Sequence, residues 1–495
     1  MMSIRNIVLF VVISLLTFNS CKEKEKNTTD LAEYKTPLNL PPNILFILCD
    51  DLGYADVGFN GSTDITTPNL DQLAQDGSIF TAAYVAHPFC GPSRAALLTG
   101  RYPHTIGSQF NLPANGASTG KGITAQEQFI SVPMQEAGYY TGAIGKWHLG
   151  ETTAYHPNNR GFDDFYGFLA GGHKYFPEEY RQQYKRQKEA GAKIINDYVL
   201  PLEHNGTTLQ ENEYLTDAFS REASRFIREA KNKNKPFFLY LAYNAPHVPL
   251  EAKKEDLDKF KHIEDKDRRT YAAMVYAIDR GVGSIVKNLK KTGQFENTLI
   301  IFLSDNGGHT GHGANNFPLT GRKGDTWEGG YRVPMFFHWP NKVPKGQKFD
   351  FPVSSLDFYP TLNYLAGATI PENKILDGKN IWEAFTSNQN PHDKETLFAM
   401  RHREGYTDVA ARQNDWKAVK VHQEPWKLYN ITNDISEKTD LSTEQPAILE
   451  KLVTETENWS KTHTEPLWFD PLYLEQMWND STMATFNQTF KISQD

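Results

Sequence analysis

The chain has 495 residues, a formal net charge of −8, 39% hydrophobic residues and 23% charged residues. This composition is typical of globular proteins and excludes collagen, coiled-coil and disordered chains, while the mild acidity predicts no nucleic-acid partner. Three cysteines cannot build a disulfide framework. The fold therefore has to be stabilised by a hydrophobic core, which a chain of this length can bury.

Residues 1–20 are predicted to be a signal peptide. Arg5 precedes the apolar run Ile7–Phe18, in which Ser14 and Thr17 are the only polar residues. At about 1.5 Å per helical residue this run is too short for a hydrocarbon core of about 30 Å. It has the length of the apolar segment of an export signal.

The next segment, residues 21–41, is predicted to be a lipidated tether. Ser20 before Cys21 resembles a bacterial lipoprotein cleavage site, with Cys21 lipidated by the lipoprotein processing machinery, and an ordinary secretory signal cut near Ser20 is the alternative. The charged stretch Lys22–Thr29 has nothing to bury and resembles the export signal of surface lipoproteins in Bacteroidota. We expect an exported outer-membrane or periplasmic lipoprotein, or alternatively a soluble periplasmic protein.

Continuous apolar runs of strand length follow. They are Asn43–Cys49, Phe237–Tyr243, Thr298–Leu303 and Pro334–Trp339. Runs without polar alternation indicate strands that are buried on both faces. The predicted class is therefore α/β, with a large sheet sandwiched by helices over residues 42–388.

Two of the covering helices can be located from their periodicity. Apolar side chains between Phe219 and Ala230 recur at helical spacing and form one face. A second helix is predicted over Arg268–Lys291, and Gly293 is expected to end it.

A smaller C-terminal domain is predicted over residues 389–495. The composition changes near 388–393, and the short β-like runs Val409–Arg412 and Trp416–Val421 precede a helix over Pro446–Trp459. We expect an α+β domain with a four-stranded antiparallel sheet and one helix.

Carboxylates follow two of the predicted strands. Asp50 and Asp51 end the first run, and Asp305 and Asn306 end the third. The carboxyl ends of strands form the ligand crevice of an open α/β sheet, and converging carboxylates repel one another unless a cation lies among them. Oxygen ligands favour Ca²⁺ or Mg²⁺ over zinc. The alternative is that these residues cap helices and form turns.

Cys90 begins the segment Cys-Gly-Pro-Ser-Arg-Ala-Ala-Leu-Leu-Thr-Gly-Arg. Its position before the helical stretch Arg94–Thr99 places it at a helix N-terminus, where anions bind. From the residues alone, Cys90 is either a thiolate nucleophile near a cation or a buried, inert thiol.

Cys-Gly-Pro-Ser-Arg followed by Leu-Thr-Gly-Arg resembles the maturation signature of type I, formylglycine-dependent sulfatases of the alkaline phosphatase superfamily. The resemblance extends from about Pro42 to Trp459 and implies a mixed, alkaline phosphatase-like sheet. It also implies that a formylglycine-generating enzyme converts Cys90 to formylglycine (3-oxoalanine), whose hydrate is the nucleophile. The metal it implies is Ca²⁺, with Mg²⁺ as the less usual ion.

The resemblance also implies roles for individual residues. The implied metal ligands are Asp50, Asp51, Cys90, Asp305 and Asn306. The implied catalytic residues are Cys90, Arg94, Lys146, His148, His247 and Lys323. Among these, Arg94 stabilises the charges beside the formylglycine, and Lys146 and Lys323 bind sulfate. His148 contacts the formylglycine hydroxyl and assists the later elimination, and His247 protonates the leaving alcohol. Without the family context, each such lysine or histidine would be an ordinary structural or solvated residue.

The predicted function is an exported carbohydrate sulfatase. Its substrate would be a sulfated polysaccharide or oligosaccharide, with algal carrageenan, ulvan or fucan favoured and animal glycosaminoglycans left open. The alternatives are a phosphoester or phosphonate monoester hydrolase, and an inactive surface glycan-binding lipoprotein, which would lack a nucleophile or a ligand. Candidate substrate-binding residues are His173, Lys174, His309 and His312. The aromatic run Trp468–Tyr473 either packs or forms a sugar platform.

Overall fold

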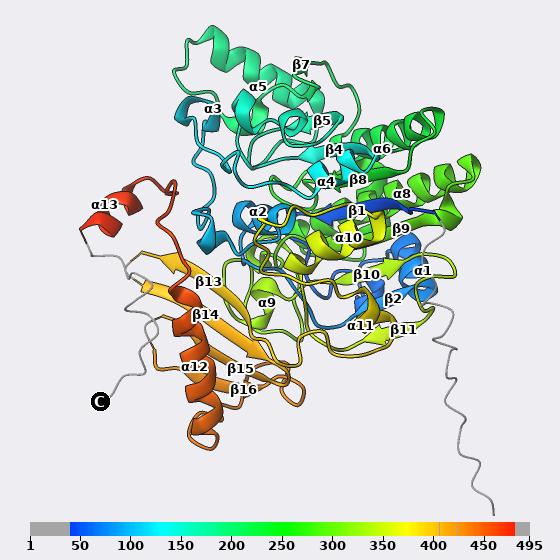
Figure 1. The fold of residues 1–495 in the computed structure, drawn as a ribbon. Coiled ribbons are helices and arrows are strands. Elements are labelled where there is room, and N and C mark those ends of the chain that lie inside the picture. Colours follow the sequence, from blue (N-terminus) through cyan, green and yellow to red (C-terminus); the bar gives the residue numbers. More distant parts are fainter. Residues whose placement is uncertain (1–39, 405, 423, 481–495) are drawn as a thin grey trace, which may run out of the picture.

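The structure, a computed structural model, describes residues 40–404, 406–422 and 424–480. A large sheet lies between two layers of helices, and a smaller sheet lies beside them (Figure 1). The predicted signal peptide, Cys21 and the tether up to residue 39 lie outside the described residues. Within the described ranges, no helix is long and apolar enough to cross a membrane.

The central sheet has ten strands in the order β11-β2-β10-β9-β1-β8-β4-β5-β6-β7. Their bounds are β1 Asn43–Cys49, β2 Ser78–Phe80, β4 Tyr140–Lys146, β5 Asp164–Phe168, β6 Glu203–His204, β7 Thr207–Thr208, β8 Phe237–Ala242, β9 Thr298–Ser304, β10 Met335–His338 and β11 Gln347–Phe349. Strands β9, β1, β8, β4 and β5 run parallel, whereas β10 is antiparallel to β9 and β2. The sheet is therefore mixed, as predicted, and its central strands end at one edge.

The predicted apolar runs are strands with both faces buried. β1 has the predicted bounds, and β8, β9 and β10 agree with theirs to within one residue at each end. Along β1, Phe46 and Leu48 pack into one core cluster, and Leu45 and Ile47 pack into the other. This alternation confirms the sandwich, because each strand contributes side chains to both helix layers.

Two helix layers cover the central sheet. The helices of the described residues, including those outside these layers, are α1 Pro68–Asp76, α2 Cys90–Thr99, α3 Gly116–Thr119, α4 Ser131–Glu136, α5 Pro177–Glu189, α6 Leu215–Asn232, α7 Lys254–Leu257, α8 Lys266–Thr292, α9 Glu328–Tyr331, α10 Phe358–Ala366, α11 Trp382–Thr386, α12 Pro446–Ser460 and α13 Tyr473–Asn479. Buried side chains of α1, α6 and α8 pack on one face, and those of α2, α4 and α10 on the other. α8 ends at Gly293, which has a φ of 71° as its predicted role requires.

The C-terminal sheet consists of four antiparallel strands, as predicted. They are β13 Leu397–Arg403, β14 Tyr406–Gln413, β15 Trp416–Lys420 and β16 Lys427–Asn430. Helix α12 packs its apolar side chains on this sheet, and a separate two-stranded sheet joins β3 (Ala83–Tyr84) to β12 (Val353–Ser354). The predicted boundary between residues 388 and 389 falls between α11 and β13, and it stays a prediction.

A buried ion network joins the C-terminal sheet to the larger part of the protein. Lys417 of β15 is fully buried, with its Nζ 3.0 Å from an oxygen of Glu328 and 2.7 Å from one of Glu437. Glu328, which begins α9, also accepts hydrogen bonds from Tyr84 and Arg332. Burial raises the pKa of Glu328, but Lys417 and the neighbouring arginines outweigh it and lower that pKa to about 2.

We expect the substitution Lys417→Met to lower the free energy of unfolding by about 3–5 kcal/mol, because it leaves two buried carboxylates without their shared cation. Lys427→Met is the matched control, since Lys427 pairs with Glu424 at the surface and such pairs contribute at most about 1 kcal/mol. Urea unfolding followed by fluorescence measures both variants. Equal, small losses would contradict the structural role of the buried network.

Candidate functional site

The carboxyl ends of three central strands carry the predicted charged residues. Asp50 and Asp51 follow β1, Asp305 follows β9, and Lys146 is the last residue of β4. β9, β1, β8 and β4 are parallel neighbours, so these side chains reach the same edge of the sheet. All four residues are buried. The structure therefore brings together residues that the sequence separates by up to 255 positions.

Arg94 joins these strand ends. Its Nε donates to Asp305 Oδ2 at 2.8 Å, one terminal nitrogen lies 3.8 Å from Asp50 Oδ2, and another donates to the carbonyl of Lys146 at 3.0 Å. The side chain is completely buried. A buried guanidinium with fixed donors holds several acceptors in one geometry, so Arg94 orients the ends of β9, β1 and β4.

Two lysines balance the remaining carboxylate charge. Lys146 Nζ lies 2.5 Å from Asp50 Oδ2, and Lys323 Nζ lies 2.6 Å from Asp51 Oδ1. Burial alone would raise the pKa of Asp50, but Lys146, Arg94 and Lys323 outweigh it and hold that pKa below its usual range. Asp50 and Asp51 are therefore ionised and paired with lysines away from water, whereas burial and the charge of Asp50 raise the pKa of Asp305 to about 7.

The oxygen atoms of this cluster fit a divalent cation. Ligand atoms of Asp50, Asp51 and His247 lie within 4.8 Å of one another. Asp50 Oδ1 and Asn306 Oδ1 are buried and have no hydrogen-bond partner among the described residues. Buried oxygens are rarely left unpaired, and a donor set rich in carboxylate and amide oxygens suits a hard ion such as Ca²⁺ or Mg²⁺.

Cys90 is the first residue of α2 and is only 3% exposed. Its Sγ lies 3.7 Å from Asn111 Oδ1, which also accepts a hydrogen bond from the Gly91 amide. Burial and the negative charges of Asp50 and Asp305 raise the pKa of Cys90, despite the nearby lysines. The thiol is therefore protonated, and the structure does not support an unmodified thiolate nucleophile. The sequence offers no motif that marks Asn111, whose contact depends on a loop fold.

His148 lies beside Cys90 in a strained backbone conformation, with a φ of 64°. Its ring packs closely against two glycines: a Cβ on Gly171 would lie 2.7 Å from His148 Nε2, and one on Gly91 would lie 3.4 Å from Cε1. The His148 Nδ1 is buried with no partner among the described residues, and burial lowers the pKa of the ring. The structure thus places a neutral imidazole next to the first turn of α2.

His247 follows β8 and faces the carboxylate cluster. Its Nδ1 lies 2.7 Å from the carbonyl oxygen of Val248, to which it donates in the neutral ring, and its Nε2 lies 3.8 Å from Asp51 Oδ2. Burial lowers the pKa of His247 to about 4. The ring of Tyr198 lies 6.4 Å away, and this residue, like Asn111, carries no signal in the sequence.

The four predicted substrate-binding residues fall into two groups. His173 is buried with its ring nitrogens 2.7 and 2.8 Å from the carbonyl oxygens of Lys174 and Leu200, and Lys174 pairs with Glu251 at 2.7 Å. These two residues stabilise their own loop, and their predicted substrate contacts gain no support from the geometry. His309 and His312 stack at 3.9 Å, are partly exposed, and follow β9 beside the cluster. Their substrate role stays a prediction.

Comparison with known proteins identifies the class of this site. The family model "Sulfatase" matches residues 42–368, and the model "N-sulphoglucosamine sulphohydrolase, C-terminal" matches residues 323–461. Arylsulfatase J of Mus musculus is 31% identical over 92% of this chain and 83% of its own length. N-acetylgalactosamine-6-sulfatase of Canis lupus familiaris is 35% identical over 70% of this chain and 67% of its own length.

A solved structure shares most of the fold. The crystal structure of Ps i-CgsB in complex with k-i-k-neocarrahexaose is 58% identical, has a TM-score of 0.90, and covers 91% of this chain and 100% of that chain. The chain therefore belongs to the sulfatase family. It is a sulfuric ester hydrolase that acts on sulfated carbohydrates, with a divalent metal and formylglycine implied by its family.

We expect Ca²⁺ to raise the melting temperature above that in EDTA, because an ion that binds only the folded state at 100 times its Kd adds about 2.7 kcal/mol of stability. Differential scanning fluorimetry measures the shift without requiring activity. Asp51→Asn should lose most of it, whereas Asp258→Asn, which alters a surface carboxylate on another part of the chain, should keep it. Identical melting temperatures in Ca²⁺ and EDTA would contradict a metal at this cluster.

Proposed function

We propose that the protein is an exported sulfatase that removes sulfate from carrageenan oligosaccharides through a formylglycine formed from Cys90. The single observation that carries the proposal is the position of Cys90 at the N-terminus of α2, within reach of the charges of Asp50, Asp305, Lys146 and Lys323. The choice of carrageenan rests on the 58% identity with Ps i-CgsB, whose crystal structure contains k-i-k-neocarrahexaose. Ulvan and fucan remain the substrates to test against it.

The positive side chains of the site suit an anionic ester. Lys146 pairs with Asp50, and Lys323 pairs with Asp51. Each ammonium group has further protons that it can donate to a sulfate oxygen. When bound, a divalent cation held by Asp50, Asp51, Asp305, Asn306 and the modified Cys90 supplies further positive charge to the sulfate group. Formylglycine, once hydrated, supplies the attacking hydroxyl. Arg94 holds the ends of three strands in place while charge develops on the sulfate.

His247 is assigned to the leaving group. Its Nδ1 is engaged by the Val248 carbonyl, so only Nε2 can carry a proton toward the cluster. A pKa of about 4 makes the ring neutral at pH 7, and an anionic ester bound beside it favours the protonated form. His148, which packs beside Gly91 and has an unpartnered ring nitrogen, is suited to accept a proton from the residue at position 90.

The alternatives have less support. An inactive glycan-binding protein would lack a nucleophile or a metal ligand, and each predicted one is present. Family membership favours sulfate esters over phosphate or phosphonate esters. We further propose that residues 1–20 direct export, and that Cys21 is lipidated by the lipoprotein processing machinery, which would hold the enzyme at a membrane surface on the tether.

Co-expression with a formylglycine-generating enzyme should give a protein that releases free sulfate from carrageenan oligosaccharides, measured by ion chromatography. Cys90→Ala should release none above background, because no hydroxyl nucleophile can form at that position. Peptide mass spectrometry verifies the conversion of Cys90 in the wild type. Release only from ulvan or fucan would overturn the substrate, and turnover by Cys90→Ala would overturn the mechanism.

We expect His247→Gln to lower kcat/KM on the sugar sulfate by about 10²–10⁴-fold, the usual contribution of a general acid. An aryl sulfate should lose much less, because a phenolate leaves without being protonated. Initial rates on both substrates, measured with equally converted protein, give the comparison. Equal losses on the two substrates would assign His247 to another role.

A further inference from the structure

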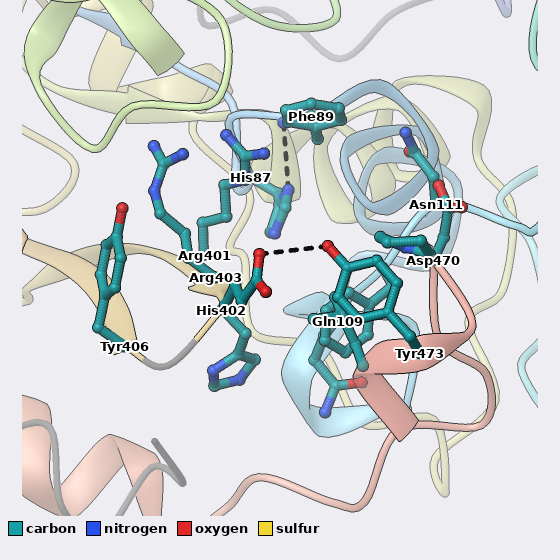
Figure 2. A pocket seen from close by; sticks show the side chains of 14 residues that line it. His87, Phe89, Gln109, Asn111, Arg401, His402, Arg403, Tyr406, Asp470 and Tyr473 are labelled. Atoms are coloured by element: carbon teal, nitrogen blue, oxygen red, sulfur yellow. Dashed lines mark hydrogen bonds between the residues drawn. The ribbon is translucent and has the colours of Figure 1, made fainter. Parts of the chain in front are cut away.

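Figure 2 shows a second cavity, of about 430 Å³. Three segments form it: the chain before and after α2, strand β13 with the start of β14, and the C-terminal segment that follows α12. Its lining residues are His87, Phe89, Gln109, Phe110, Asn111, Arg401, His402, Arg403, Glu404, Tyr406, Asp470, Pro471, Tyr473 and Leu474. No role was predicted for most of these residues.

The cavity adjoins the sulfate site directly. Asn111 lines it and lies 3.7 Å from Cys90 Sγ. The ring of Phe89 contacts a cation of each site, with Lys323 Nζ 5.2 Å and Arg401 Cζ 4.2 Å from its centroid. One aromatic side chain therefore links the lysine of the reaction centre to the arginine of the cavity. A glycan chain that places one sugar at Cys90 would reach the cavity with its neighbour.

Arg401 forms no ion pair among the described residues, although the charges of Asp325 and Asp408 lie close enough to act on it. Among the described residues it donates to the carbonyl oxygen of Gly324 at 2.9 Å, and no carboxylate lies within ion-pair distance. By contrast, Arg403 pairs with Asp408 and Asp325. Burial and the charge of Arg403 lower the pKa of Arg401 to about 10. A half-buried guanidinium of this kind gains from a bound anion, because the anion replaces the water that burial removes.

The other lining groups suit sugar hydroxyls. Tyr473 is 54% exposed and donates to Glu404, and Asp470 lies on the same side of the cavity (Figure 2). His87 Nε2 and Gln109 Oε1 are buried without a partner among the described residues. Aromatic faces with a few convergent donors and acceptors are typical of small-ligand sites.

We propose that this cavity is the subsite for the sugar adjoining the one that is desulfated, and that Arg401 binds an anionic substituent on that neighbouring sugar. The substituent is a sulfate ester or a carboxylate, since both accept hydrogen bonds from a guanidinium. The inference rests on the proposed function in taking the ligand to be a glycan chain. It adds that the enzyme distinguishes its substrates by the charge of the next sugar.

Calorimetric binding to the full chain with unconverted Cys90, which cannot turn over the ligand, tests the proposal. The probes are three matched oligosaccharides that carry the target sulfate and differ in the neighbouring sugar, which is sulfated, uronic or neutral. Arg401→Gln should weaken binding of the charged probes by about tenfold or more, the usual loss for a hydrogen bond to a charged group. It should leave binding of the neutral probe within about twofold, by the same reasoning.

The controls separate this loss from general effects. Arg186→Gln removes one charge from an exposed position on α5 and should bind all probes as the wild type does. Arg401→Lys should retain part of the preference, and equal melting temperatures show that the variants are folded. Comparison of the sulfated with the uronic probe identifies which anion Arg401 prefers.

Two results would overturn the subsite: an unchanged affinity of Arg401→Gln for the charged probes, or equal losses on charged and neutral probes. The proposed function is judged by sulfate release from the matured wild type. A protein that binds through Arg401 but releases no sulfate would keep the subsite and lose the proposed reaction.

Discussion

Buried carboxylates are paired with buried cations where β1, β4 and β9 end, and the other parts of the site are arranged around these pairs. Removing one partner would leave an uncompensated buried charge, at a cost of about 3–5 kcal/mol. Arg94 satisfies this constraint by bonding to Asp305 and the Lys146 carbonyl together. The buried cations that stabilise these carboxylates also suit an anionic ester. The groups needed for folding and for catalysis therefore lie at the same edge of the sheet.

The C-terminal sheet lies beside the larger part of the protein (Figure 1) and lines the second cavity. Its buried Lys417 links it to Glu328 and Glu437, and its first strand supplies Arg401 and Arg403 to the cavity beside Cys90. The segment after α12 completes that cavity while burying Trp468 and Phe469. The run Trp468–Tyr473 was predicted either to pack or to form a sugar platform. Its first part packs, and Tyr473 lines the cavity. Differences among relatives in this small sheet would alter substrate choice without altering the reaction centre.

The strands with continuous apolar runs and the charged residues within motifs could be predicted from the sequence. Continuous apolar runs identified β1, β8 and β9, whereas β4 was missed because Gly142 interrupts its apolar pattern. That glycine is required by packing, since a Cβ there would lie 2.4 Å from Phe226. The charged residues of the site follow strands or motifs and were predicted. Asn111 and Arg401 were not, because loop geometry alone brings Asn111 to Cys90 and inter-sheet geometry alone brings Arg401 to Phe89. The loop that carries His173 folds it inward, which no sequence pattern showed, and its substrate role stays a prediction.

The burial of Cys90 also has a consequence for the order of events in the cell. A modifying enzyme has to reach the sulfur of a residue that is only 3% exposed once folding is complete. The contact that fixes α2 in place joins Arg94 to Asp305, 211 residues later. At about 5–20 residues per second, synthesis of that interval takes roughly 10–40 s. During that interval Cys90 is not yet enclosed by the contact of α2 with the end of β9, so the conversion that we propose has the most access to it before β9 joins the sheet.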